Sequence, residues 1–189
     1  MPFEHSDNPR VTPIYEPEPE VAELLDKTRG EVSDVPLAIF RTMAHHPRLL
    51  KRFNLLGGFF LGRGELPARE RELAILRTAW RSQAVYEWAQ HVVIGRRAGI
   101  TDEEITRIAQ TEIAAEWSDD DLTLMKATDE LLDGVDISDA VWAALGERWN
   151  ETERIELVML IGFYRMVAGF LNATGVQPEE HLAGWPTKE

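Results

Sequence analysis

The sequence predicts an all-α, single-domain helical bundle of about nine helices. Two observations support this prediction: apolar residues recur at spacings of three and four, and helix-capping residues separate these segments at short intervals. In addition, no run of β-branched residues alternates with polar residues as in a half-buried strand. With 189 residues, 44% of them hydrophobic, the chain is long enough to bury one core.

Residues 1–20 are predicted to form an extended arm because they include five prolines. Each proline lacks an amide donor and pushes the preceding residue toward extended conformations. The apolar residues Val11, Ile14 and Tyr15 would lay this arm along its own domain or along a neighbouring subunit, and a loose tail is the alternative. Residues 21–189 are assigned to the all-α domain.

The N-terminal half is predicted to contain five helices, several of which begin at a proline or end at a glycine. Their expected ranges are about 20–29, 37–44, 47 to about 57, 67–82 and 85–99. Gly57 and Gly58 weaken the end of the third helix, so the stretch "LGGFFLGRG" is interpreted as a loop.

Four further helices are predicted in the C-terminal half, each from a capping signal. Thr101 and Glu104 have the spacing of a capping box, which stabilises a helix N-terminus. The other starts are at Ser118, Ser138 and Asn150, and the expected ends include Gly134 and Gly175.

The most apolar stretch is residues 156–171, which Arg165 interrupts. It is shorter than the roughly 20 residues that span a bilayer. We therefore interpret it as a buried core helix or as a subunit interface.

The composition narrows the possible partners. The formal net charge is −13, from 33 acidic and 20 basic residues, and phosphates would be repelled. We therefore expect neither nucleic acid nor an anionic membrane as a partner. The chain has no cysteine, so thiol chemistry and thiolate metal sites cannot come from it. No targeting segment is visible, and a cytoplasmic location is expected.

Glu72 is an acidic residue on the apolar side of its predicted helix. It lies four residues before Leu76 and seven before Ala79, whereas Arg77 and Arg81 take positions that can remain solvated. A buried carboxylate has to be paired or protonated, so this position indicates a paired or functional group. The alternative is a first-turn glutamate that tips into water.

The stretch "YEWAQH" places Glu87 and His91 four residues apart on the next predicted helix. Ala84 and Ile94 fall on the same stripe, so both side chains point along a largely apolar face. Antiparallel packing of the two helices would bring Glu72 toward the far half of this second helix. We therefore expect Glu72, Glu87 and His91 to form an acid–base site, although a histidine on such a face is often only a satisfied core residue.

A metal site is a rival use of the same three residues. Two glutamates and a histidine suit a hard or borderline cation, but no second helix repeats the Glu87-x-x-x-His91 pair. The other histidines lie in predicted loops or near the termini. We therefore predict neither a metal nor a cofactor.

A short internal similarity links "RERELAIL" (69–76) with "TERIELVML" (152–160). It makes Glu72 and Glu156 counterparts, and a duplicated helical pair is a hypothesis that this one match raises.

The block from Ala44 to Ile108 resembles the carboxymuconolactone decarboxylase and alkylhydroperoxidase D-like family. The features that carry the resemblance are the proline-initiated helix, "RELAILRTA", "YEWAQH" and the closing "AGITDEEI". The resemblance implies an all-α fold that assembles as a homo-oligomer (trimer, hexamer or dimer). It also implies that Glu72 and His91 match the proton-relay pair of the family.

The resemblance also shows what this chain lacks. Peroxidase-type members carry Cys-x-x-Cys-x-x-x-His, and the two cysteine positions fall on Ala84 and Glu87 here. Thiol peroxidase activity is therefore not expected. Glu87, with Tyr86 and Trp88, matches the branch without cysteines that includes the decarboxylases.

Together these observations predict a lyase or isomerase that uses a Glu/His proton relay on a small lactone or carboxylate metabolite. His91 would be the general acid or base, Glu72 would orient it, and Glu87 would be a second acid or a hydrogen-bond partner. Tyr86, Trp88 and Trp80 are expected to shape the pocket, and Arg77, Arg81 or Arg96 to hold a carboxylate. The alternatives are a non-catalytic oligomeric binding protein and an accessory role in peroxide or redox metabolism.

Overall fold

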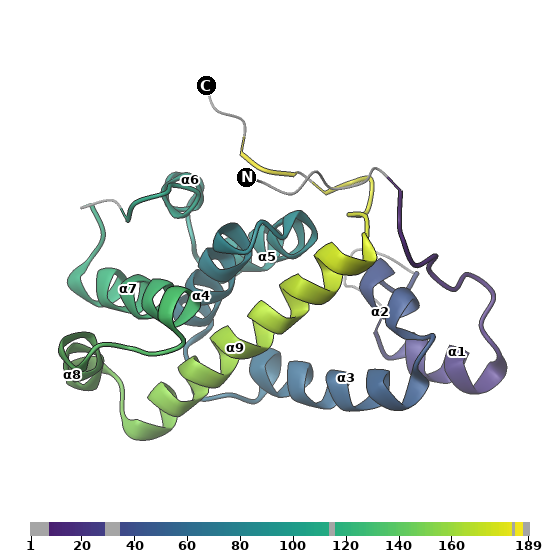
Figure 1. Cartoon of the computed structure of the whole chain (residues 1–189), viewed down its shortest axis with the longest axis horizontal. Coiled ribbons are helices and arrows are strands. Elements are labelled where there is room, and N and C mark those ends of the chain that lie inside the picture. Colours follow the sequence, from purple (N-terminus) through teal and green to yellow (C-terminus); the bar gives the residue numbers. More distant parts are fainter. Residues whose placement is uncertain (1–7, 29–34, 114–115, 183, 187–189) are drawn as a thin grey trace.

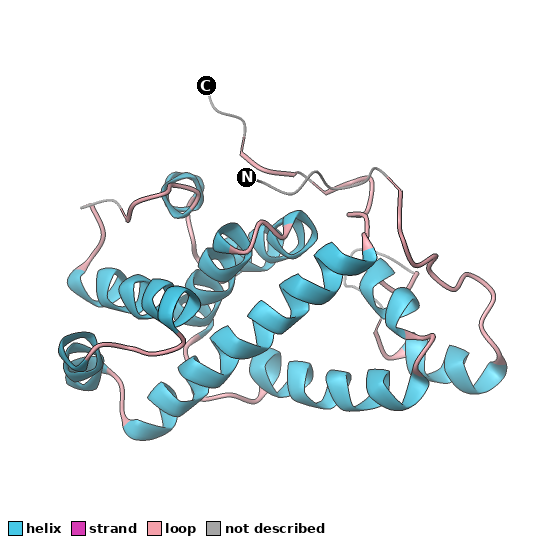
Figure 2. Cartoon of the chain, in the orientation of Figure 1, coloured by secondary structure: helices cyan, strands magenta, loops and turns pink. Residues whose placement is uncertain are grey.

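The structure is a computed structural model that describes residues 8–28, 35–113, 116–182 and 184–186. Over these residues it contains nine α-helices and no β-strand, which confirms the all-α prediction (Figures 1 and 2). The helices are α1 (Pro19–Asp26), α2 (Ala38–Met43), α3 (Pro47–Gly62), α4 (Ala68–Arg81), α5 (Val85–Arg97), α6 (Asp102–Ile108), α7 (Asp119–Gly134), α8 (Asp139–Arg148) and α9 (Glu151–Thr174).

Helix α4 lies at the centre of the fold. Every residue from Glu72 to Ala79 is buried, and the helix packs against α5, α7 and α9. Figure 1 shows α6, α7 and α8 gathered at one end of the molecule and α1, α2 and α3 at the other. Helix α9 crosses between the two groups, so residues of α4, α5 and α9 meet in the interior.

The capping signals fix several helix ends as expected. Thr101 and Glu104 form the predicted capping box at the start of α6, and Asn150 forms another with Glu153 at the start of α9. Gly175 ends α9 with a φ of 69°, a left-handed conformation that glycine adopts without strain.

Helix α3 is longer than predicted, and the expectation of a loop at Gly57 and Gly58 is wrong. The helix continues through both glycines to Gly62. Each glycine costs a helix only about 1 kcal/mol. Phe53 and Phe60 lie on this helix and pack against the ring of Phe163 in α9, with centroid distances of 5.2 and 5.4 Å. Burial of these aromatic rings offsets the weak local propensity.

Two other helices also have boundaries that differ from the predictions. Gly134 is the last residue of α7 rather than the residue after it, and Val135 adopts the left-handed conformation with a φ of 57°. Helix α1 begins at Pro19, inside the predicted arm, and ends at Asp26, before the predicted end.

Helix α9 extends beyond the apolar stretch in both directions and comprises 24 residues. By length and hydropathy it could cross a membrane. Nine of its residues are nevertheless buried within the fold, and they include Leu160, Tyr164 and Leu171. Its packing against α4, α5, α7 and α8 is that of a core helix, one of the two roles expected for this stretch.

The described part of the arm, residues 8–18, lies along its own chain. The amides of Arg10 and Val11 donate to the carbonyl of Thr174, and the amide of Ile14 donates to the carbonyl of Arg41. The guanidinium of Arg41 also lies over the ring of Tyr15. These contacts support the first of the two placements expected for the arm, along its own domain.

The connection between α3 and α4 is joined to α9 by a buried carboxylate. Glu156 accepts hydrogen bonds from the amides of Glu65 (2.6 Å) and Leu66 (3.3 Å). Gly64 leaves room for this carboxylate, since a Cβ at position 64 would lie 2.0 Å from Oε1 of Glu156. Glu72 and Glu156 thus both bury their side chains, as counterparts would, but Glu156 pairs with backbone amides.

We predict that Gly64→Ala destabilises the protein by about 1–3 kcal/mol, because the displaced carboxylate leaves the partly buried amide of Glu65 and the buried amide of Leu66 without an acceptor. Urea denaturation measures the change. Gly58→Ala is the matched control, since nothing lies within 4 Å of the added methyl group and alanine favours the helix. It should raise stability by roughly 0.5–1 kcal/mol. Equal effects of the two substitutions would contradict the role of Gly64.

Candidate active site

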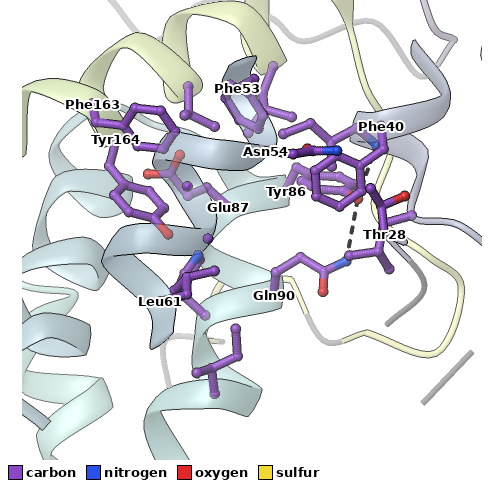
Figure 3. A pocket seen from close by; sticks show the side chains of 18 of the residues that line it. Thr28, Phe40, Phe53, Asn54, Leu61, Tyr86, Glu87, Gln90, Phe163 and Tyr164 are labelled. Atoms are coloured by element: carbon purple, nitrogen blue, oxygen red, sulfur yellow. Dashed lines mark hydrogen bonds between the residues drawn. The ribbon is translucent and has the colours of Figure 1, made fainter. Parts of the chain in front are cut away.

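A cavity of about 260 Å³ lies among α2, α3, α5 and α9. Most of its wall is apolar, and six polar or ionisable side chains reach it from the helices (Figure 3). These are Asn54 of α3, Tyr86, Glu87, Gln90 and His91 of α5, and Tyr164 of α9. The cavity thus collects proton donors and acceptors inside a largely apolar enclosure.

Glu72 and His91 form a buried pair next to this cavity. Nδ1 of His91 lies 2.7 Å from Oε2 of Glu72, and the guanidinium Nε of Arg71 donates to Oε1 at 2.9 Å. Burial alone would raise the pKa of Glu72. His91 and Arg71 outweigh this effect through their charges and their hydrogen bonds, and they hold the pKa of Glu72 below its ordinary value. Glu72 is therefore an ionised acceptor that orients the imidazole and leaves Nε2 available to a ligand.

Glu87 is a second buried carboxyl group, in a different environment. It lines the cavity with 2% of its surface exposed, and neither carboxyl oxygen has a hydrogen-bond partner among the described residues. Burial raises the pKa of Glu87 well above its ordinary value. Burial therefore favours the protonated form of Glu87, which can donate a proton or a hydrogen bond into the cavity.

Tyr164 is a cavity residue that the sequence analysis did not identify. Its ring meets the imidazole of His91 edge to face, with centroids 5.0 Å apart. Burial, together with the negative charge of Glu72, raises the pKa of Tyr164 well above its ordinary value, so its hydroxyl remains a donor. Tyr164 lies in the most apolar helix, where a tyrosine in a core and a tyrosine in a site give the same sequence signal.

Tyr86 lines the cavity as expected, and it is held together with Gln90 by the C-terminal segment. The Tyr86 hydroxyl donates to Oε1 of Glu179 (3.1 Å), and the Gln90 amide donates to Oε2 (2.5 Å). Glu179 also accepts from the amide of Ala38 at the start of α2 (2.9 Å). One carboxylate thus holds this side of the cavity to α2 and α5.

Trp80 and Trp88 do not line the cavity, so the expectation that they shape it is wrong. Their rings pack together, with centroids 5.9 Å apart, and both contact Trp185 of the C-terminal segment. Burying these apolar surfaces against one another takes them away from the cavity.

Arg77 was expected to remain solvated and to hold a carboxylate, and the structure contradicts this. Its side chain is fully buried, pairs with Asp129 at 2.6 Å and donates to the carbonyls of Ile108 and Gln110. The physical reason is that α4 is covered on all sides, so its middle has no solvated position. Arg81 and Arg96 pair with aspartates and also lie outside the cavity lining.

The two carboxyl groups that the sequence predicted for the site therefore differ in environment. Glu72 pairs with His91 and its pKa is lowered, while Glu87 has no partner among the described residues and its pKa is raised. Opposite displacement of two pKa values in one site is the pattern that assigns a base and an acid. Within residues 8–28, 35–113, 116–182 and 184–186, no three metal-ligating side chains are grouped to hold one ion.

The opposite pKa shifts predict opposite pH dependences of stability. Folded Glu87 keeps its proton above pH 4.5, its ordinary pKa, whereas the unfolded chain releases it. The contribution of Glu87 to stability is therefore complete below pH 4.5 and is lost as pH rises toward the folded pKa. Glutamine stays neutral, so the stability of Glu87→Gln relative to the wild type should rise by up to about 1.4 kcal/mol for each pH unit above pH 4.5.

Urea denaturation at several pH values measures this difference, with Glu103→Gln on the exposed face of α6 as the control for net charge. Glu72→Gln should show the opposite sign, because a lowered pKa gives stability that is present above pH 4.5 and is lost as pH falls. A pH-independent gap between wild type and Glu87→Gln would show that Glu87 is not a buried neutral acid.

Comparison with known proteins agrees with this architecture. The sequence profile of the carboxymuconolactone decarboxylase family matches residues 47–130. Among solved structures, the debrominase Bmp8 superposes with a TM-score of 0.76 at 14% identity, covering 93% of this chain and 95% of that chain. A debrominase variant has also been solved in complex with 2,3,4-tribromopyrrole.

Two bacterial proteins share the fold as well. A peroxidase-related protein from Ralstonia eutropha JMP134, described as an alkylhydroperoxidase AhpD core, has a TM-score of 0.71 at 20% identity and covers 90% of this chain and 93% of its own. A putative antioxidant defence protein AhpD from Agrobacterium tumefaciens has a TM-score of 0.67 at 15% identity, covering 72% of this chain and 94% of its own. No protein of curated function matches the sequence significantly. At these identities the structural likeness establishes the fold alone.

Proposed function

Because residues 47–130 of this chain belong to the carboxymuconolactone decarboxylase family, we propose that the chain is an enzyme, a lyase or isomerase that moves a proton on a small lactone or related carbonyl compound. The observation that supports this is that His91, which pairs with Glu72, and the unpartnered, buried Glu87, whose pKa is raised, line one cavity among the described residues. A base and an acid at the same cavity are what enolisation of a carbonyl compound requires.

In this proposal Nε2 of His91 removes the proton from the carbon next to the carbonyl group. The electron pair of that C–H bond moves onto the carbonyl oxygen, which accepts a hydrogen bond from protonated Glu87. Glu72 stabilises the imidazolium that forms, through its 2.7 Å contact with Nδ1. His91 then returns the proton to another carbon of the same dienolate, so the step is an isomerisation without net oxidation.

Isomerisation of α-angelica lactone, a β,γ-unsaturated γ-lactone, tests the proposal. Its conversion to the conjugated α,β-unsaturated isomer is followed by ultraviolet absorbance, and deuterium incorporation from D₂O is followed by NMR. The wild-type protein should accelerate both above the buffer rate. Lactone binding without isomerisation or exchange would instead support the non-catalytic binding protein of the same fold.

We also infer that the chain acts as a homo-oligomer. Several large apolar side chains of α3 and α9 are exposed, including Leu55 at 69% and Ile155 at 63%, together with Phe59 and Met159. An exposed apolar surface of this kind is typical of a protein interface. A monomer in sedimentation velocity would contradict this inference. The lack of cysteine is compatible with the cytoplasmic location that we propose.

A further inference from the structure

The cavity wall has the composition expected for an apolar ring. Phe40, Phe53 and Phe163 line it, and Phe53 stacks on Phe163 with centroids 5.2 Å apart. Aliphatic side chains complete the wall, among them Leu61 and Ile94. Aromatic walls favour flat, weakly polar ligands, because rings pack face to edge or offset against them. The volume of 260 Å³ equals roughly nine waters, which is enough for one or two small rings.

Cationic side chains are nearly absent from the lining. Among the described residues that line the cavity, Lys27 is the one with a permanent positive charge, and 69% of its side chain is exposed. Its ammonium pairs with Glu23 at 3.6 Å, on the outer side of α1. The imidazole of His91 is already paired with Glu72. A ligand carboxylate buried beside the ionised Glu72 would therefore lack a counter-charge, which is costly.

Three buried polar atoms at the cavity have no hydrogen-bond partner among the described residues. Neither carboxyl oxygen of Glu87 is hydrogen-bonded to a described residue, nor is Oδ1 of Asn54, which reaches the cavity from α3. Buried polar atoms of this kind are rare unless something else satisfies them. Protonated Glu87 would donate to an acceptor, and the Asn54 oxygen would accept from a donor.

We propose that this cavity binds an uncharged, ring-shaped carbonyl compound. Its carbonyl oxygen accepts a hydrogen bond from Glu87, and its ring packs among the phenylalanines. A ligand that also carries a polar hydrogen donates it to Oδ1 of Asn54. This inference rests on the proposed function, because it assigns the ligand class of the same site. It replaces the sequence-based expectation that an arginine holds a carboxylate, since Arg77, Arg81 and Arg96 all lie outside the cavity lining.

Matched pairs of a lactone and its ring-opened carboxylate test the charge preference. Phthalide is compared with 2-(hydroxymethyl)benzoate, and α-angelica lactone with levulinate, by isothermal titration and ligand-observed NMR on the full chain at neutral pH. The lactones should bind at least about tenfold more tightly than their carboxylates. Equal or tighter binding of the carboxylates would overturn the inference, and so would binding of neither class at about 1 mM.

Variants then test the proposed contacts. Glu87→Leu should weaken phthalide binding roughly two- to tenfold, because it removes the donor to the carbonyl oxygen, while Glu87→Gln keeps a donor and should bind nearly as the wild type. Glu103→Gln, on the exposed face of α6, is the matched control. Unchanged affinity in Glu87→Leu would contradict the Glu87 contact.

The two proposals fail in different ways. Lactone binding without isomerisation or deuterium exchange would remove the proposed enzyme function and leave the ligand class standing. Isomerisation of α-angelica lactone together with preferred binding of the carboxylates would remove the ligand class and leave proton transfer standing.

Discussion

Replacing His91 by alanine should lower the rate of α-angelica lactone isomerisation by roughly 10²–10⁴-fold, the range that one general acid–base group contributes. The reason is geometric: Nδ1 of His91 is held by Glu72 at 2.7 Å, and the ring lies in the cavity wall beside Tyr164. Exogenous imidazole should restore part of the rate, because the alanine variant leaves a space of that shape next to Glu72.

Glu72→Gln separates positioning from structure. It should lower kcat by roughly 10–100-fold with little change in KM, since Glu72 lies behind His91 and does not line the cavity. His45→Ala is the control, because His45 is exposed, bonds the carbonyl of Thr12 and does not belong to the cavity lining. If His91→Ala kept the wild-type rate while remaining folded, or if imidazole had no effect on it, His91 would not be the proton-transfer residue.

Replacing Arg77 by methionine should cost about 3–5 kcal/mol of stability, because Asp129 and three backbone carbonyls lose a fully buried partner. For a chain of 189 residues this corresponds to a fall in Tm of roughly 6–20 °C. Differential scanning calorimetry measures the change. Arg77 joins α4 to α7 and to the segment after α6, so the loss is expected to affect the whole fold.

Arg81→Met is the matched control for Arg77→Met. Arg81 also pairs with Asp129, at 2.8 Å, but a quarter of its side chain is exposed. Its loss should cost about 1 kcal/mol or less. The double variant Arg77→Met with Asp129→Asn should be less destabilised than the sum of the two single substitutions, since no unpaired charge remains. A fall in Tm for Arg77→Met no larger than that for Arg81→Met would mean that the buried network is not a main source of stability.

Local signals in the sequence predicted most helix boundaries. Capping residues such as Thr101, Ser118 and Asn150 act within one turn of the chain, so their effect can be read without the fold. The prediction failed at Gly57 and Gly58, where propensity favoured a loop. There the decisive term is the packing of Phe53 and Phe60 on Phe163, about 100 residues away along the chain.

Part of the candidate site was also predictable. The spacing of Glu72, Glu87 and His91 along helical stripes indicated that all three point inward, and the structure places Glu72 against His91 and lines the cavity with Glu87 and His91. Tyr164 and Asn54 were missed because each lies on a helix whose own pattern gives no sign of a cavity. Gln90 was missed although it lies on the same helix as Glu87 and His91. Trp80 and Trp88 were wrongly assigned to the pocket because spacing shows whether a side chain points inward, and not toward which neighbour. Arg77 was expected to be solvated and is fully buried, because the other helices cover α4.

The all-α class, the approximate order of the helices and the inward orientation of the acid–base residues could be inferred from the amino-acid sequence, because helical periodicity and capping are local properties. Which inward residues share a cavity, and which carboxyl group has a raised pKa, depends on how the helices pack. Helices α3, α5 and α9 are distant in sequence, and their packing leaves Glu87 without a partner while it gives Glu72 both His91 and Arg71. Protonation follows from burial and from neighbouring charges, and both exist only once the helices have packed.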